Sequence, residues 1–562
     1  MRRFDKDLEI CREKKKRLFR REREERFHGF GCLLYSFLMF LTKTSLVTNL
    51  SQIYIVVSIV VVLFIKFGFD TLRKQSFMSA SAPLPPGPTP WPIVGSLPTS
   101  NEGDETEIAC IRLGNVNVIP VTSPELAREF LKKHDAMFSS RARMMGTEYM
   151  TRGYLTTVFV PYGEQWKKMR RIISSELVSP ARLDWLFEKR NEEDNNLVFY
   201  IYNQCVNSVD GGGEVVDVRL AIRHYTGNVV RKMIFNTRYF GKGRKDGGPG
   251  IEEVEHIDSV SKGLSFVYAF CISDFLPYMR WLGFEGHEKI MKETRKVIHK
   301  YHDPLIDERI QQWSNKKDGQ MPKKVPGDLL DVLISLEADG KPVLSTEEIK
   351  AESVELFYVT IDNTSNAIEW AMAEMITQPD ILRKAVQEID MLVGKDRLVQ
   401  ESDCPKLNYV KACAWEALRL HPLESFNVLH VLNSDQVVGG NFIPKGSHVV
   451  LSRYGLGRNA RIWDEPFKFM PERHLKFEDG SLAKVDLAVP ELRFMSFGIP
   501  LSTTIATMSW ARLLQGFEWS PPYGDQSRID LSESNVNHSM ANPLLAHAKP
   551  RLPAHVYTTA KI

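Results

Sequence analysis

A run of five polar residues interrupts a long apolar helical pattern within residues 350–377. Apolar residues return in phase at Ile368 and Met372, which predicts a buried helix and argues against a helix end or an exposed face. Polar side chains of this kind compete for backbone hydrogen bonds and can bend a helix. Such a notch in a core helix can hold water, substrate and a proton relay. The candidate catalytic residues are Asp362, Asn363, Thr364 and Ser365, followed by Asn366.

A second cluster combines one glutamate with two arginines. Glu416 and Arg419 stand three apart in residues 406–420, whose apolar stripe predicts a buried helix that stops near Pro422. Residues three apart lie on one helix face, and a buried glutamate beside a guanidinium is tolerated only if the two are paired. Arg473 can supply further donors through its planar fork. The spacing therefore predicts a structural lock of three residues.

An aromatic residue and a basic residue four apart predict a site for a carboxylate. Trp166 and Arg170 fall on one face of a predicted helix, where an indole N–H and a guanidinium can together hold that group. The alternative is a packed tryptophan beside a surface arginine. Lys167, Lys168 and Arg171 add a basic patch that can dock an acidic partner protein.

The order of these motifs resembles that of the cytochrome P450 enzymes. Trp415–Pro422 followed by Pro471–Arg473 resembles their glutamate-arginine-arginine lock. Ile361–Met375 and Val399–Asp403 are similar to one plant subfamily, which N-hydroxylates amino acids and converts them to aldoximes. The resemblance runs in the family's order from Leu84 to the C-terminus.

The resemblance implies a mainly α cytochrome P450 fold, a helical domain with small β-sheets. It also implies a haem cofactor, and electrons that come from NADPH through NADPH–cytochrome P450 reductase. The implied substrate is an amino acid, oxidised at nitrogen in specialised metabolism of the glucosinolate or cyanogenic type. By resemblance, the cofactor-binding residues are Trp166, Arg170 and His430, and the substrate-facing residues are Phe426 and Asn427.

One family motif departs from the pattern. The loop Phe-x-x-Gly-x-Arg-x-Cys-x-Gly, whose cysteine thiolate ligates the haem iron, corresponds to a stretch from Phe494 to Thr504 that contains no cysteine. The sulfur anion pushes electron density toward bound oxygen, and neutral ligands do not replace it. The nearest cysteine in sequence, Cys413, lies on the predicted lock helix, so no metal ligand is predicted. Thr364 and Leu429 stand where the subfamily has proline.

Two interpretations follow from the missing cysteine. The first is a haem monooxygenase that N-hydroxylates an amino acid and is impaired in this chain. The second is a catalytically inactive, membrane-anchored scaffold of the same fold, or a defective gene product.

The N-terminal part predicts a membrane anchor. Residues 53–65 are almost unbroken in apolar residues, and with their flanks they approach the length of a membrane span. Basic residues follow the span, which predicts a single-pass protein of the endoplasmic reticulum membrane with a cytosolic catalytic domain. Membrane lipid is then a partner. The basic N-terminal arm favours the opposite orientation and so competes with this prediction. The predicted parts are a charged extension at 1–44, a transmembrane anchor at 45–70, a proline-rich hinge at 71–95 and a cytochrome P450-like domain at 96–562.

The composition argues against several other classes of protein. A net charge of +3 over 562 residues gives no indication of a basic surface for nucleic acid. The seven cysteines lack CxxC spacing, which argues against a disulfide framework or a zinc site and favours a reducing compartment. Alternation predicts short strands within 111–121, 436–438 and 448–452, and Ser123 predicts the cap of a helix.

Overall fold

A five-stranded sheet is built on the hairpin predicted from Gly114 and Asn115. β1 (Ile111–Leu113) and β2 (Val116–Val121) pair antiparallel, and Gly114 adopts a φ of 56°, which glycine reaches without steric cost. β10 (His448–Leu451) joins β2 in parallel. The predicted hairpin is therefore confirmed, and a strand more than 300 residues further along the chain extends it.

Two short strands complete this sheet and bring distant segments together. β7 (His430–Val431) pairs antiparallel with β10 and with β3 (Ser140–Arg141), so the strand order is β1-β2-β10-β7-β3. Arg141 lies directly opposite His430. Helix α3 (Pro124–Arg128) follows β2, and the Ser123 hydroxyl caps it as predicted.

Helix α13 (Thr346–Thr377) is continuous over 32 residues and passes through the polar notch without a break. It begins with a capping box, in which the Ser345 hydroxyl and the Glu348 carboxylate accept each other's backbone N–H. Almost all of its side chains are buried, because helices pack on several of its sides. These neighbours include α8 (Val218–Phe235), α9 (Ile251–Tyr268), α11 (His287–Ser314), α15 (Asn408–Leu420) and α17 (Pro500–Gly516).

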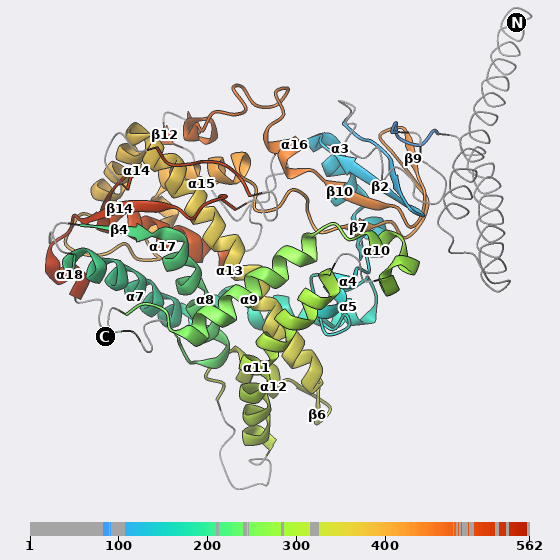
Figure 1. Ribbon diagram of the computed structural model, residues 1–562, viewed down its shortest axis with the longest axis horizontal. Helices are drawn as coiled ribbons and strands as arrows, with labels where there is room; N and C mark the ends of the chain where they lie inside the picture. The colour runs from blue at the N-terminus through green and yellow to red at the C-terminus, as the bar shows by residue number, and fades with distance from the viewer. Residues whose placement is uncertain are drawn as a thin grey trace, which may run out of the picture. The chain divides into compact units, whose positions relative to one another are not determined.

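The other elements surround α13 on both sides (Figure 1). A three-stranded sheet of order β13-β14-β4 lies on the left of Figure 1 beside α7, whereas the five-stranded sheet with α3 lies on the right. This is a mainly α fold with small sheets, as the sequence predicts. The remaining helices and strands around the site are α4 (Met145–Met150), α5 (Glu164–Ile172), α7 (Phe187–Val206), α14 (Pro379–Leu392), β4 (Glu214–Asp217), β13 (Phe517–Ser520) and β14 (Leu545–Pro550).

The computed structural model describes residues 82–88, 90, 107–208, 213–239, 244, 247–282, 286–314, 325–475, 477–478, 481–482, 485, 493, 500–522, 528–534 and 539–558. Within these ranges, no helix has both the length and the apolar character of a membrane span. The extension predicted at 1–44 and the anchor predicted at 45–70 lie outside the described residues, as do most of the hinge at 71–95 and residues 494–499 of the shortened loop.

Candidate active site

Glu416 is the centre of a buried polar cluster that joins α15 to the segment ending at residue 474. Arg419 donates from Nε and Nη2 to the two carboxylate oxygens at 2.8 Å each, and Arg473 Nε donates at 3.0 Å. Two further donors reach Glu416: His474 Nε2 at 2.8 Å and the backbone N–H of Met470 at 2.9 Å. The three residues of the predicted lock therefore lie together, and His474 joins them. The position of His474 directly after Arg473 is the one signal in the sequence that could have indicated its place in the lock.

The partners of Glu416 keep its carboxylate ionised inside the core. Burial on its own raises the pKa of a carboxyl group, but hydrogen bonds from Arg419 and His474 lower the pKa of Glu416 to about 2. Arg419 is completely buried, and its Nη1 donates to the carbonyls of Gly457 and Pro466 at 2.5 and 2.7 Å. Matched charges and backbone acceptors thus fix the later segment onto α15.

A second buried acidic pair lies on α13, and the sequence did not reveal it. Glu355 accepts the backbone N–H groups of Thr157 at 3.0 Å and Val158 at 3.1 Å, and Glu352 accepts the Thr157 hydroxyl at 3.4 Å. Within the described ranges neither carboxyl group has a cationic partner. Burial raises the pKa of both groups, and the charge of Glu355 raises that of Glu352 further, to well above the usual range.

Arg141 and His430 form a basic pair at the paired strands β3 and β7. Arg141 Nη1 lies 2.9 Å from His430 Nδ1, and Arg141 Nε donates to the carbonyl of Val158 at 3.1 Å. The N–H of Tyr162 donates to the Ser140 hydroxyl at 3.2 Å, which holds the segment before α5 against β3. Burial and the charge of Arg141 lower the pKa of His430 to about 4, so its ring is neutral at pH 7. Arg141 was not predicted, because only strand pairing makes it a neighbour of His430.

Trp166 and Arg170 lie on α5, which follows the segment that Tyr162 holds against β3. Arg170 is exposed, and no described residue forms a hydrogen bond or an ion pair with it. The indole N–H of Trp166 likewise has no acceptor among the described residues. The indole N–H and the guanidinium on α5, without partners among the described residues, suit one carboxylate, and the Arg141–His430 pair suits a second.

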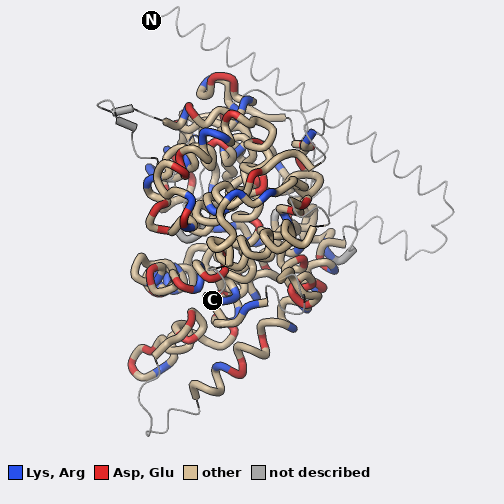
Figure 2. Tube along the Cα trace, turned by 90° about the vertical axis from the view of Figure 1, so that its left-hand side faces the viewer, with Lys and Arg blue, Asp and Glu red and all other residues tan. Residues whose placement is uncertain are grey.

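The basic patch predicted around α5 is only partly at the surface. Lys168 turns toward α13 and pairs with both oxygens of Glu348 at 2.7 and 2.8 Å. Lys167 is exposed and pairs with Glu164 on its own helix, and Arg171 is exposed. Lysine, arginine and acidic residues are interleaved along the coloured part of the trace in Figure 2. Lys168 therefore pairs within the fold, whereas Lys167 and Arg171 lie at the surface.

Asp362, the first residue of the notch, faces α8 and α9. The Ser261 hydroxyl donates to it at 2.6 Å, and Arg223 Nε lies 3.5 Å away. A carboxyl group that the sequence did not single out, Glu424, lies in the loop after α15. Burial, opposed by the charge of Arg453 and reinforced by that of Asp362, raises the pKa of Glu424 to about 8. Glu424 therefore carries a proton over much of the neutral range.

The remaining notch residues point to different sides of α13. Asn363 Nδ2 donates to the carbonyl of Val359 at 2.9 Å, and the Ser365 hydroxyl donates to the carbonyl of Asp362 at 3.3 Å. The Thr364 hydroxyl is buried and has no hydrogen-bond partner among the described residues. Because a helix has 3.6 residues per turn, these consecutive side chains cannot all face one ligand. Thr364 alone among them has a side-chain oxygen that is buried and unbonded.

Phe426 and Asn427 differ in their surroundings. Phe426 is 45% exposed. Asn427 is buried, and its Oδ1 accepts the N–H of Leu451 at 2.6 Å while its own N–H donates to the Leu451 carbonyl at 3.2 Å. Asn427 thus braces the end of β10, and Phe426 presents an aromatic surface.

Burial raises the thiol pKa of Cys413, Cys404 and Cys110. Cys413 is completely buried on α15, where burial and the nearby carboxylates raise its pKa well above the usual range. Burial also raises the pKa of Cys404 to about 12 and that of Cys110 to about 11. In the described ranges, no group of three or more His, Cys, Asp or Glu residues could hold a metal ion.

Comparison with known proteins identifies one family. The sequence model described as Cytochrome P450 matches residues 85–543. Isoleucine N-monooxygenase 1 of Lotus japonicus is 53% identical over 501 residues, which cover 85% of this chain and 92% of the relative. Phenylalanine N-monooxygenase of Arabidopsis thaliana is 50% identical over 500 residues, covering 85% and 93%. Tyrosine N-monooxygenase of Sorghum bicolor is 48% identical over 504 residues, covering 85% and 88%.

Solved structures share the fold. A zebra fish cytochrome P450 determined with progesterone superposes with a TM-score of 0.62 and covers 80% of this chain and 97% of its own. Its sequence is 20% identical, so this likeness concerns the fold alone.

Proposed function

We propose, from the premise that the chain belongs to the cytochrome P450 family, that its substrate is an amino acid and its reaction class is N-hydroxylation to an aldoxime. The observation that carries this proposal is a sequence identity of 48% to 53% with relatives that are named N-monooxygenases of isoleucine, phenylalanine and tyrosine. These three side chains differ in size and polarity. The feature their substrates share is the amino-acid backbone, so that is the part we assign to this chain.

Haem is the cofactor of this family, and the donor set described above fits its two propionates. Trp166 and Arg170 on α5 would hold one propionate, since their N–H groups have no other acceptor among the described residues. Arg141 and His430 lie beside the start of α5 and would serve the other. A haem ligated by a thiolate supplies oxygen activation.

The residues that would ligate the iron do not fit the family's haem. The stretch from Phe494 to Thr504 contains no cysteine, and Cys413 is a buried thiol within the lock helix. Using Cys413 as the ligand would require α15 to unfold, and with it the lock around Glu416. We therefore propose that the chain keeps the fold and the amino-acid site but is impaired in oxygen chemistry.

Glu424 and Asp362 are the residues we assign to proton handling. An amino acid arrives as an ammonium ion and must release a proton before its nitrogen has a lone pair to react. Glu424 exchanges a proton near neutral pH, which suits a general acid or base. Asp362 accepts the Ser261 hydroxyl and faces Arg223 at 3.5 Å, and we assign its carboxylate to the cationic amine of the substrate. Thr364, with its unbonded hydroxyl, is the notch residue we assign to water or substrate.

The partners and location follow from the family. We propose that NADPH–cytochrome P450 reductase supplies electrons, and that residues 45–70 anchor the chain in the endoplasmic reticulum membrane with the catalytic domain in the cytosol. Lys167 and Arg171, exposed on α5, are the residues of the predicted patch left to meet an acidic partner.

The missing cysteine also supports a second candidate function. A chain that keeps its lock and its sheets but lacks a thiolate can act as a catalytically inactive, membrane-anchored scaffold that binds amino acids. The two candidates share the fold and differ in redox chemistry.

A restored loop tests the proposed function. We would insert the family segment Gly-x-Arg-x-Cys after Phe497 and prepare a control insertion with serine in place of the cysteine. We expect the red-shifted Soret band of thiolate-bound haem, in reduced carbon-monoxide difference spectra, from the cysteine insertion only. With reductase and NADPH, that protein is expected to turn an amino acid into its oxime. A Soret band from the chain as it stands would contradict the impairment. A restored band without any oxime would favour the scaffold.

A further inference from the structure

Three buried glutamates share one face of α13, and each contacts α5 or the segment that precedes it. Glu348, Glu352 and Glu355 stand four and three residues apart, so they lie on one side of the helix. Glu348 accepts Lys168 Nζ at 2.7 Å and Gln165 Nε2 at 2.9 Å, and both donors belong to α5. This glutamate face therefore fixes the helix that carries the donors proposed for one carboxylate of the cofactor.

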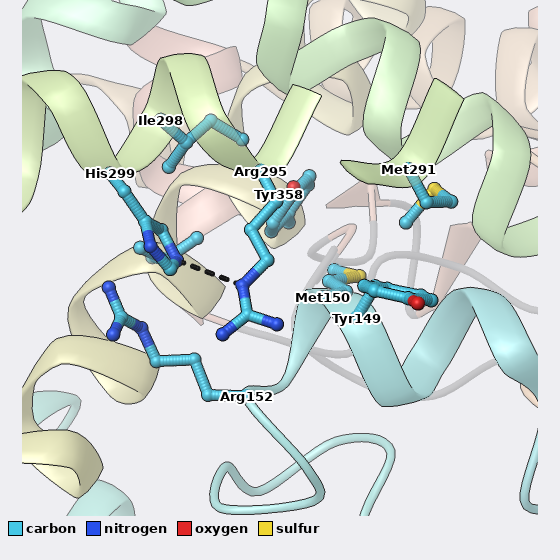
Figure 3. Close-up of a pocket in the computed structure, with 9 residues that line it drawn as sticks. Tyr149, Met150, Arg152, Met291, Arg295, Ile298, His299 and Tyr358 are labelled. Atoms are coloured by element: carbon cyan, nitrogen blue, oxygen red, sulfur yellow. Dashed lines mark hydrogen bonds between the residues drawn. The ribbon is translucent and has the colours of Figure 1, made fainter. Parts of the chain in front are cut away.

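Another side of the same turns of α13 is closed. Val354 and Tyr358 line a pocket of about 10 Å³ together with residues of α4 and α11 (Figure 3). Such a volume is room for one water-sized group. This side of α13 therefore has no space for a substrate or a cofactor, and the glutamate face is the side that reaches the cofactor donors.

Glu355 fixes the backbone at Val158. It is 2% exposed, and its carboxylate accepts the N–H groups of Thr157 at 3.0 Å and Val158 at 3.1 Å. The carbonyl of Val158 accepts Arg141 Nε at 3.1 Å. Both backbone groups of Val158 are thus engaged, one by α13 and the other by Arg141. A shift of this segment would move the guanidinium, because its Nε is held at that carbonyl.

The place of Arg141 decides which nitrogen of His430 carries the proton. His430 Nδ1 lies 2.9 Å from Arg141 Nη1 and 2.7 Å from the carbonyl of Phe138. A guanidinium can only donate, so Nδ1 accepts from Arg141 when the proton is on Nε2. A proton on Nδ1 would instead be donated to Phe138. In the first tautomer Nε2 is an N–H donor suited to a carboxylate, whereas in the second it is an acceptor that repels one.

We infer that Glu355 is a positioning residue of the cofactor site, which acts through Val158 to hold Arg141 where it orients His430 toward a carboxylate of a porphyrin. This inference rests on the proposed function, because the porphyrin comes from there. The contacts concern carboxylates alone. The iron and the missing cysteine therefore take no part in them.

The test measures porphyrin binding by the purified full chain and needs no iron ligand. The probes are metal-free protoporphyrin IX, which carries both propionates, and its dimethyl ester, each followed by quenching of tryptophan fluorescence. The ratio of the diacid affinity to the diester affinity is compared between variants, so partition of the porphyrins into detergent cancels. Arg141→Gln should lower this ratio about tenfold, since it removes a charged donor.

Glu355→Gln should lower the same ratio about fivefold and leave the diester affinity within about twofold. Glutamine offers the two backbone N–H groups one acceptor oxygen and a competing donor, so the segment at Val158 shifts. Glu355→Asp keeps both oxygens on a side chain that is shorter by one methylene group, and its ratio should fall between. If the glutamine variant does not fold, the aspartate variant carries the test by the same ratio.

Glu369→Gln is the matched control. Glu369 is a buried glutamate of the same helix that accepts the N–H of Leu544 at 2.9 Å and pairs with Arg219 at 2.8 Å. Its substitution should lower stability but leave the ratio of affinities unchanged. A ratio that falls equally in Glu355→Gln and Glu369→Gln would assign both effects to general loss of structure and overturn the inference.

Double substitutions separate positioning from direct binding. Glu355→Gln combined with Arg141→Gln should lower the ratio no further than Arg141→Gln alone, because Glu355 acts through Arg141. Combined with Arg170→Gln, the two losses should multiply, since Arg170 belongs to the other pair of donors. An unchanged ratio in Glu355→Gln, or a loss that multiplies with that of Arg141→Gln, would overturn the inference.

The outcomes distinguish this inference from the proposed function. If Arg141→Gln and Arg170→Gln both leave the ratio unchanged, the proposed cofactor site fails and the inference fails with it. If both lower the ratio and Glu355→Gln does not, the cofactor site stands and the inference alone fails. If the loop-restored chain forms no oxime while Glu355→Gln lowers the ratio, the positioning role stands and the proposed reaction fails.

Discussion

The lock around Glu416 and the Glu352–Glu355 pair on α13 both contain buried carboxyl groups, yet the pKa values of these groups shift in opposite directions. Glu416 meets two guanidiniums and an imidazole, and its pKa falls to about 2. Glu352 and Glu355 meet backbone N–H groups and a hydroxyl, and their pKa values rise. Equal burial therefore leaves one cluster ionised and favours a proton in the other.

The difference shows that the partners of a buried carboxyl group decide its charge. Burial removes water from both clusters and penalises the ion in both. Only the lock brings cations close enough to offset that penalty. The lock thus holds segments together through ion pairs. The α13 pair instead holds the segment at Thr157–Val158 through hydrogen bonds to carboxyl groups that are neutral or partly neutral.

The largest expected effect is the loss of Arg419. Arg419→Ala removes two of the hydrogen bonds to Glu416 and should lower the free energy of unfolding by about 3 kcal/mol or more, because it weakens the pairing of a buried charge. Chemical denaturation measures this, and we expect aggregation on expression. Arg383→Ala is the control: Arg383 also pairs with an acid three residues away, Asp380, but on the exposed face of α14, and should cost less than about 1 kcal/mol. Normal stability in Arg419→Ala would mean that α15 is not the core element described here.

Neutralising one carboxylate in each cluster tests the comparison directly. Glu416→Gln should cost about 2 kcal/mol, since Arg419 and Arg473 lose their counter-charge in the core. Glu352→Gln keeps the shape of a group whose raised pKa favours the protonated form, and should change the free energy of unfolding by less than about 1 kcal/mol. Equal losses in the two variants would show that charge state does not distinguish the clusters.

The pH dependence of stability should carry the same contrast. The pKa of Glu416 is lowered from 4.5 to about 2, so its contribution is present above its unfolded pKa and is lost as the pH falls toward 2. The pKa of Glu424 is raised from 4.5 to about 8, so its contribution is present below its unfolded pKa and is lost as the pH rises toward 8.

Unfolding curves from pH 2 to pH 9 separate these two terms. In a plot of the free energy of unfolding against pH, Glu416→Gln should reduce the slope between about pH 5 and 2. Glu424→Gln should reduce the slope between about pH 5 and 8. Each reduction should be about 1 kcal/mol per pH unit at most. Parallel curves for wild type and both variants would contradict the assigned directions.

The smallest expected effect is at Thr364, whose buried hydroxyl has no partner among the described residues. Thr364→Val replaces that hydroxyl with a methyl group, so the free energy of unfolding should change by less than about 1 kcal/mol or rise slightly. In the loop-restored chain the same variant should lower oxime formation, since we assign the hydroxyl to water or substrate. A large loss of stability would instead indicate a structural hydrogen bond at this position.

The sequence by itself determined the features that arise within one element. The apolar period predicted α13 and α15, the turn residues Gly114 and Asn115 predicted the hairpin, and Ser123 predicted a cap. The Glu416–Arg419 contact belongs to this group, because residues three apart on a helix must be neighbours. Such features depend on local geometry, which neighbouring residues fix without help from the rest of the fold.

Only the tertiary structure decided which distant groups meet. Glu355 reaches an N–H 198 positions earlier, and Arg141 meets His430 across 289 positions. Neither spacing carries a periodic signal, because strand pairing and helix packing set these contacts through the whole fold. The same holds for Lys168, an exposed residue by pattern that pairs with Glu348. Charge state follows from these partners, so the sequence could name the carboxyl groups but not assign their protons.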